Sequence, residues 1–176
     1  QRLYDKTPSF SCKEGCTRCC DNWVQCAPEE EARCGGFAFG DRLCPKLEGE
    51  KGCSVYENRP FICRLFGSAE NLPCPYGYGP EQPLTKEEAS ALLREYLKSL
   101  IPYGLDGIEG YYTDYTPDME QRYRAMAQEL GLVISGGTDY HGANKPHITI
   151  GAGKGNLEIP YSVLDGLRQR HQEIYK

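Results

Sequence analysis

The chain of 176 residues is acidic, with a formal net charge of −5, and only 39% of its residues are hydrophobic. An acidic chain without a basic stripe is not expected to bind nucleic acid. No segment approaches the roughly 18 to 20 apolar residues that a membrane helix needs, and the first residues lack the charged-then-apolar pattern of a signal peptide. We therefore expect a soluble, cytoplasmic protein with no membrane partner.

Ten cysteines lie in the first 74 residues, and none follows. The chain opens with four of them in a C-x3-C-x2-C-C arrangement: Cys12, Cys16, Cys19 and Cys20. Thiolates are the soft ligands that zinc and iron–sulfur clusters select. An even number of cysteines is also typical of a disulfide-stapled secreted scaffold, so the spacing alone leaves both interpretations open.

The segment after this opening predicts a short helix at residues 28–34. Pro28 suits the first helical position, and the three glutamates that follow suit the positive end of a helix. Gly35 and Gly36 are expected to end it. We expect a short strand or the start of a helix at 21–24, and a strand fragment at 37–39.

The remaining cysteines of the candidate ligand set are spread more widely: Cys44, Cys53, Cys63 and Cys74. Arg59 and Arg64 flank Cys63. Two guanidinium groups there would compensate the negative charge of a multi-thiolate centre, or hold an anionic substrate beside it. Surface salt bridges to Glu57 or Glu70 would explain the same two arginines.

These sequence motifs together resemble those of a known family. The chain is similar to the YkgJ-type cysteine-cluster proteins in three successive motifs. They are the cysteine-rich opening, then Cys44-Pro-Lys-Leu, and then the run from Gly52-Cys53-Ser-Val-Tyr through Asn-Arg59-Pro60-Phe-Ile-Cys63-Arg64. The resemblance covers about residues 9–95 and implies a zinc- or iron-chelating module. Cys26 and Cys34 lie between the two halves of the motif and depart from the family pattern.

Residues 71–83 are rich in proline, glycine and tyrosine and predict an irregular loop. Thr85-Lys-Glu-Glu88 is a capping box. Apolar residues then recur at spacings of three and four, which predicts an amphipathic helix over about 86–100 with a core-facing stripe.

The last part of the chain alternates between strand and helix patterns. We expect strands at 105–112 and 132–135, an extended piece at 147–150, and a last helix from Pro160 to about Arg170. Between the first two strands, Thr116 and Pro117 begin a helix that Gly131 ends. Strand, helix and strand in this order predict parallel pairing with a right-handed crossover.

This part of the chain resembles a second family. It is similar to the end of a polymerase and histidinol phosphatase (PHP) barrel. The similarity lies in the element Ser135-Gly-Gly-Thr-Asp139-Tyr-His141-Gly142, with Gly104-Leu-Asp-Gly-Ile-Glu109 before it and Lys145-Pro146 after it. The resemblance covers about 95–172 and implies that Asp139 and His141 ligate a divalent metal at the mouth of a strand.

The count of histidines limits what this second resemblance implies. A full PHP site opens with a His-x-His pair, whereas this chain has three histidines and no such pair. His147 and His171 are expected to be surface or packing residues, and Glu109 a supporting or structural acid. A complete phosphoesterase site would need a protein partner or a second copy of the chain.

The sequence therefore predicts an α+β protein: a cysteine-rich, metal-stabilised module at 1–84, an amphipathic helix and joint at 85–103, and a partial PHP-like α/β segment at 104–176. The expected function is metal binding, with an iron–sulfur cluster, such as a 4Fe–4S centre, or zinc, in a redox or structural role. The alternative is a PHP-like phosphoesterase with a divalent ion at Asp139 and His141. The expected thiolate ligands are Cys12, Cys16, Cys19, Cys20, Cys44, Cys53, Cys63 and Cys74.

Overall fold

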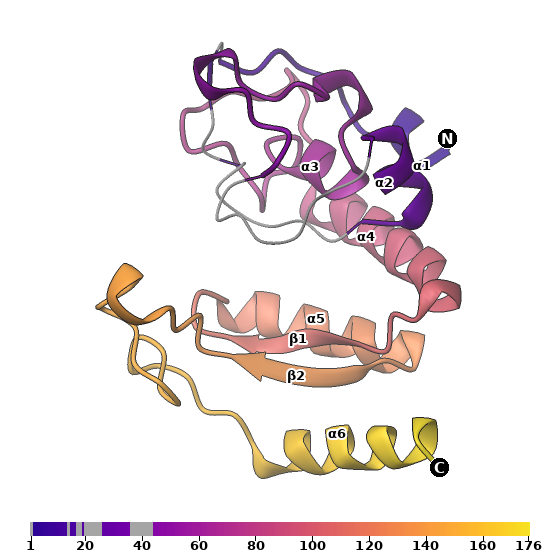
Figure 1. Cartoon of the computed structure of the whole chain (residues 1–176), viewed down its shortest axis with the longest axis vertical. Helices are drawn as coiled ribbons and strands as arrows, with labels where there is room; N and C mark the ends of the chain where they lie inside the picture. Colours follow the sequence, from indigo (N-terminus) through magenta and orange to yellow (C-terminus); the bar gives the residue numbers. More distant parts are fainter. Residues whose placement is uncertain (1, 14, 17–18, 20–25, 36–43) are drawn as a thin grey trace. The chain divides into compact units, whose positions relative to one another are not determined.

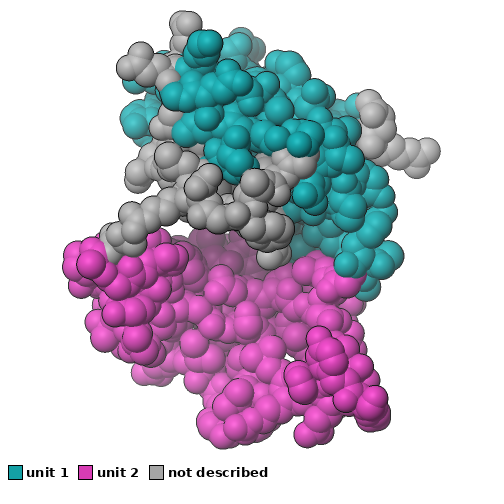
Figure 2. All heavy atoms as spheres, in the orientation of Figure 1, with its two compact units in different colours: residues 1–103 teal, residues 104–176 magenta. Residues whose placement is uncertain are grey.

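The computed structural model describes residues 2–13, 15–16, 19, 26–35 and 44–176. The chain divides into two compact units, Gln1–Tyr103 and Gly104–Lys176, which are coloured separately in Figure 2. Among the described residues there are six α-helices and one two-stranded parallel sheet, which confirms a mixed α+β fold. The expectations for 21–24, Gly36 and 37–39, and the candidate ligand Cys20, lie outside the described residues.

The first unit is built from short helices around one longer one (Figure 1). Its helices are α1 (Arg2–Asp5), α2 (Pro28–Arg33), α3 (Phe61–Leu65) and α4 (Lys86–Leu100), with 3-10 turns at Gly49–Lys51, Tyr56–Asn58 and Ile101–Tyr103. Their apolar faces form one core, which contains Phe61, Leu65, Ala69, Leu84, Ala89, Leu92 and Tyr96. In the described part of this unit, most of the cysteines lie outside the α-helices, whereas Cys63 lies in α3.

Helix α4 begins as its sequence predicts. The Thr85 hydroxyl accepts from the Glu88 backbone N–H at 3.2 Å, and the Glu88 carboxylate accepts from the Thr85 N–H at 2.9 Å. This reciprocal pair satisfies two backbone donors that the first turn would otherwise leave unpaired. The expected helix at 86–100 is confirmed, and the buried residues Ala89, Leu92 and Tyr96 lie on one side of it.

A buried carboxylate joins the helices of this unit. Glu30 is only 4% exposed, and it accepts from the backbone N–H groups of Ala27 at 2.9 Å and Phe61 at 2.7 Å. The hydroxyl of Tyr96 donates to it at 2.6 Å, and the hydroxyl of Tyr4 donates to it as well. These five residues, here called the Glu30 cluster, connect α1, α2, α3 and α4. Nothing in the local sequence distinguishes Glu30 from the two glutamates beside it.

The second unit is a β–α–β arrangement followed by a helix (Figure 1). Strand β1 (Gly107–Tyr112) and strand β2 (Val133–Gly137) pair in parallel, with Gly107 opposite Val133 and a register shift between Glu109 and Tyr111. The strands approach closely at their start, because a Cβ on Gly107 would lie only 2.7 Å from the Val133 carbonyl oxygen. The expected parallel pairing is confirmed.

Helix α5 (Pro117–Leu130) connects the two strands. At its start, the Thr116 hydroxyl accepts from the Met119 N–H at 3.3 Å, and Pro117 occupies the first turn. At its end, Gly131 adopts a left-handed conformation, and the Gly131 N–H donates to the Ala127 carbonyl. Both predicted ends of this helix are therefore confirmed. The last helix, α6 (Tyr161–Ile174), continues one turn beyond the predicted end.

The prediction of an extended segment at 147–150 was wrong. This segment forms turns, and Thr149 makes only an isolated antiparallel bridge with Gly153. Gly151 and Gly153 both have positive φ, which folds the chain back within a few residues. Ile148 is nevertheless buried, so its apolar character reflects packing of a turn rather than a strand.

None of the helices in the described ranges is both long and apolar enough to cross a membrane.

Candidate functional sites

Three described cysteines of the opening segment, Cys12, Cys16 and Cys19, belong to a part of the chain that contacts the loop of Cys74. Burial raises the pKa of the Cys12 thiol, and the neighbouring thiols of Cys16, Cys19 and Cys74 raise it further. The loop of Cys74 also meets the opening loop through the Lys13 ammonium, which lies 5.2 Å from the centre of the Tyr76 ring. These four residues, Cys12, Cys16, Cys19 and Cys74, are called here the Cys12 group.

A second set of thiols is carried by the turn at residues 44–54. The Leu47 N–H donates to the Cys44 carbonyl at 3.0 Å, and Leu47 forms an antiparallel bridge with Cys53. Burial raises the pKa of the Cys53 thiol, Cys44 adds to the rise, and Arg59 opposes it. Cys44 and Cys53 are therefore neighbours across this turn.

The two sets of thiols meet at the backbone. A Cβ on Gly52, the residue before Cys53, would lie 3.7 Å from the Cys16 carbonyl oxygen. Cys63 is half-buried in α3.

The charge of Arg59 influences one thiol of each set. Its guanidinium stacks on the Tyr56 ring at 3.5 Å from the centroid, and its Nε donates to the Tyr56 carbonyl at 2.8 Å. It lowers the pKa of both Cys19 and Cys53, each of which burial raises. The side chain is thus positioned to stabilise thiolates in both sets.

Arg64 has a different environment from Arg59. Its Nε donates to the Arg59 carbonyl at 3.1 Å, another guanidinium nitrogen donates to the Glu57 carbonyl, and the guanidinium lies 4.9 Å from the centre of the Tyr4 ring. These contacts hold the turn before α3. Arg64 therefore supports the backbone of this turn.

The nine described cysteines are free thiols. Within the described ranges, no three side chains of histidine, cysteine, aspartate or glutamate stand close enough to hold a metal ion as they are placed. The chemistry of the donor set fits zinc or an iron–sulfur cluster, because each takes four thiolates. Coordination would require the loops to draw closer together, so the ligand assignments stay predictions.

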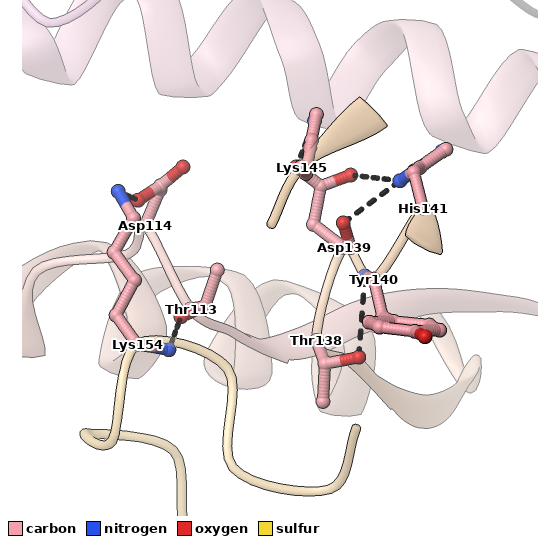
Figure 3. Close-up of polar contacts among 8 residues, drawn as sticks. All are labelled: Thr113, Asp114, Thr138, Asp139, Tyr140, His141, Lys145 and Lys154. Atoms are coloured by element: carbon pink, nitrogen blue, oxygen red, sulfur yellow. Dashed lines mark hydrogen bonds and ion pairs between the residues drawn. The ribbon is translucent and has the colours of Figure 1, made fainter. Parts of the chain in front are cut away.

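The second unit carries a polar cluster where its two parallel strands end (Figure 3). Asp139 is the one described non-glycine residue with positive φ, at 61°. Its carboxylate is paired with the Lys145 ammonium, and its Oδ1 lies 3.4 Å from His141 Nδ1. Burial would raise the pKa of Asp139, but hydrogen bonds from Lys145 and Tyr112 hold it below its usual range.

Glu109 faces the same cluster from β1. Burial raises the pKa of its carboxyl group, and the nearby Asp139 raises it further. The sequence motif that contains Asp139 and His141 did not indicate that the Lys145 ammonium would form an ion pair with the Asp139 carboxylate. His147 and His171 are both exposed, as expected, and the His171 ring lies 4.7 Å from that of Tyr175.

A separate groove of about 610 Å³ lies in the second unit between α5 and α6. Its walls include Tyr111, Arg124, Leu132, Ile134 and Val163. The Arg124 guanidinium donates to the Tyr111 hydroxyl at 2.9 Å. The groove does not include Asp139 or His141, so it is distinct from the polar cluster.

Comparison of the chain with protein-family models, with curated protein sequences and with solved structures found no match.

Proposed function

We propose that this protein binds a metal centre through the cysteines of its first unit, in a structural or redox role. The observation that carries the proposal is the contact of the Cys74 loop with the opening segment, where the Lys13 ammonium lies 5.2 Å from the centre of the Tyr76 ring. Four thiolates saturate one tetrahedral zinc ion or one 4Fe–4S cluster. The resemblance of residues 9–95 to YkgJ-type proteins supports the same assignment.

Two features of the site suit a thiolate centre. Cys12, Cys16, Cys19 and Cys74 are all half-buried, which limits the access of water and oxidants to the bound metal. Arg59 supplies a positive charge beside the group, and so offsets part of the negative charge that four thiolates bring to one ion. When bound, the metal supplies either a cross-link between loops or a site for one-electron transfer.

The decisive experiment is metal analysis, with a visible absorption spectrum, of the full chain purified without oxygen. Iron with acid-labile sulfide is expected for a cluster, and zinc alone for a structural centre. Cys74→Ser should lose bound metal, whereas Cys26→Ser, which changes a thiol outside the Cys12 group, should retain it. Wild-type protein without metal and with its thiols paired in disulfides would rule out the proposal.

A second candidate function rests on the polar cluster of the second unit. It is a PHP-like phosphoesterase in which Asp139 and His141 supply part of a divalent metal site and another chain supplies the remainder. The strained backbone at Asp139, at the carboxyl ends of parallel strands, favours it. The Lys145 ammonium on Asp139 weighs against it, because a metal ion would have to displace this cation.

Phosphomonoester hydrolysis in the presence of Mn²⁺ tests this second candidate. Activity that Asp139→Asn abolishes and His147→Ala leaves unchanged is the expected result. Equal activity in the two variants would remove Asp139 from the reaction.

A further inference from the structure

The groove between α5 and α6 has the size and the walls of a small-molecule site. Its volume of about 610 Å³ falls within the range of about 300 to 1,000 Å³ that ligand pockets occupy. Leu132, Ile134 of β2 and Val163 of α6 give it apolar walls. Neither the metal centre proposed for the first unit nor the polar cluster around Asp139 makes use of this space.

Gly166 keeps the α6 side of the groove open. It lies in the interior of α6 and lines the groove, although glycine is among the least favourable residues inside a helix. A close neighbour that leaves no room for a side chain often explains such a glycine. Here a Cβ at position 166 would meet no described heavy atom within 4 Å, apart from the adjacent backbone of its own helix. Close packing therefore does not explain Gly166, whereas an open groove does.

Arg124 gives the groove a single charge. It is the one charged residue among the described residues that line the groove. Its stem packs against β1, because a Cβ on Gly110 would lie 2.9 Å from Arg124 Cγ. Its Nη1 donates to the Tyr111 hydroxyl at 2.9 Å, and the guanidinium lies 4.9 Å from the centre of the Tyr111 ring. The arginine is thus held in place beside the groove by β1.

The protein does not use all the donors of Arg124. A guanidinium carries five N–H donors in a planar fork. Besides Tyr111, the Glu120 carboxylate lies 3.4 Å from Arg124 Nη2, in a partly exposed pair one helical turn apart, and such pairs are weak. The buried Nε has no hydrogen-bond partner among the described residues. A planar carboxylate matches the donor fork that remains.

We propose that this groove binds a small amphipathic carboxylate, a molecule with an apolar chain or ring and one ionised carboxyl group. The apolar part lies against Leu132, Ile134 and Val163, and the carboxylate binds the Arg124 guanidinium. A single guanidinium suits this monoanion better than a phosphate monoester, which carries about twice the charge at neutral pH. The site is independent of the proposed metal centre, since its residues all belong to the unit Gly104–Lys176.

The test is a titration of the full chain with octanoate, and with octanol as its uncharged counterpart, followed by methyl NMR. In the wild type, octanoate is expected to cause saturable shifts at the methyl groups of Leu132, Ile134 and Val163. Gly166→Leu places a side chain in the groove and should abolish these shifts. Gln172→Leu adds the same side chain to an exposed position of α6 outside the groove and should bind octanoate as the wild type does.

Failure to fold would not account for a loss of binding in Gly166→Leu. Leucine is a much better helix former than glycine, and position 166 has room for its Cβ. Far-UV circular dichroism of each variant checks that the helices are retained.

Arg124→Met separates the charge from the apolar walls. The variant keeps an unbranched apolar stem but lacks the charge-assisted hydrogen bonds, so it should bind octanoate about tenfold more weakly. Octanol binding should be the same in the variant and the wild type, because octanol has no carboxylate.

Three results would overturn the proposal. The first is wild-type protein without saturable shifts, or Gly166→Leu that binds octanoate as the wild type does. The second is equal weakening of octanoate and octanol binding in Arg124→Met, since the guanidinium would then not recognise the carboxylate. The third is a wild-type dimer that Gly166→Leu converts to a monomer in sedimentation experiments, which would assign the groove to a second copy of the chain.

Discussion

At the scale of single residues, the Glu30 carboxylate has the largest expected effect on stability. Glu30→Ala would leave the Phe61 N–H and the Tyr96 hydroxyl buried without their acceptor. Each such loss costs about 1 to 3 kcal/mol, so we expect a decrease of about 3 kcal/mol in the free energy of unfolding, measured in urea. Glu29→Ala, at an exposed neighbouring position, is the control and should change it by less than about 0.5 kcal/mol.

The same cluster predicts a loss of stability in alkali. Burial, followed by the Glu30 carboxylate, raises the pKa values of both Tyr4 and Tyr96 above their ordinary range in the folded protein. A raised pKa favours folding below the unfolded value of about 10, and this contribution is lost as pH rises through the folded value. Stability should therefore fall above about pH 10.

Tyr96→Phe isolates this effect from the titration of the cysteines. At pH 8 the variant should be less stable than the wild type by about 1 to 2 kcal/mol, because it lacks the hydrogen bond to Glu30. The difference should shrink towards pH 11. Above about pH 10 the Tyr96 hydroxyl ionises in the unfolded wild type and stays protonated in the folded protein, which lowers the stability of the wild type but not of the variant. A difference that stays constant between pH 8 and pH 11 would show that Tyr96 does not titrate as argued.

At the scale of elements, the start of α4 offers a direct test. Thr85→Ala removes the side-chain acceptor for the Glu88 N–H and should destabilise the first unit by about 1 kcal/mol. Thr85→Ser keeps a hydroxyl at the same position and should retain most of that stability. Chemical denaturation of both variants measures the difference, and equal stabilities would mean that the cap contributes little in this context.

Local signals were sufficient where an element is determined by its own residues. Thr85, Thr116 and Gly131 mark helix ends through backbone hydrogen bonds within a few residues, and all three act as predicted. The segment 147–150 was misassigned because its alternating apolar residues resemble a strand, whereas Gly151 and Gly153 impose a turn. A periodic pattern therefore fails where neighbouring glycines allow the chain to reverse.

The candidate sites were predictable only in part, for a different reason. Cysteine spacing identifies the opening loop, but the approach of the Cys74 loop to it, seen in the contact of Lys13 with Tyr76, depends on contacts between distant segments. The Lys145 ammonium on Asp139 and the acceptor role of Glu30 likewise arise from tertiary structure. Sequence pattern supplies the type of ligand, and the fold decides which ligands are neighbours.

At the scale of the whole molecule, metal removal should affect the two units unequally. The proposed ligands all belong to the unit Gln1–Tyr103, and metal binding stabilises the segments that it cross-links. After metal removal by a chelator, hydrogen exchange should accelerate in residues 44–84, while α5 and the two strands should exchange at an unchanged rate. Exchange measured by mass spectrometry after proteolysis distinguishes the two units, and a uniform acceleration throughout 104–176 would contradict this expectation.

The close approach of β1 and β2 at Gly107 also has a genetic consequence. A Cβ at this position would lie 2.7 Å from the carbonyl oxygen of Val133, which is backbone and has little freedom to move. Every missense change of a single nucleotide in a glycine codon introduces at least one carbon atom at Cβ. No missense change of a single nucleotide at the Gly107 codon therefore avoids this clash. In a library of single-nucleotide variants selected for folded protein, we expect this codon to retain only synonymous changes.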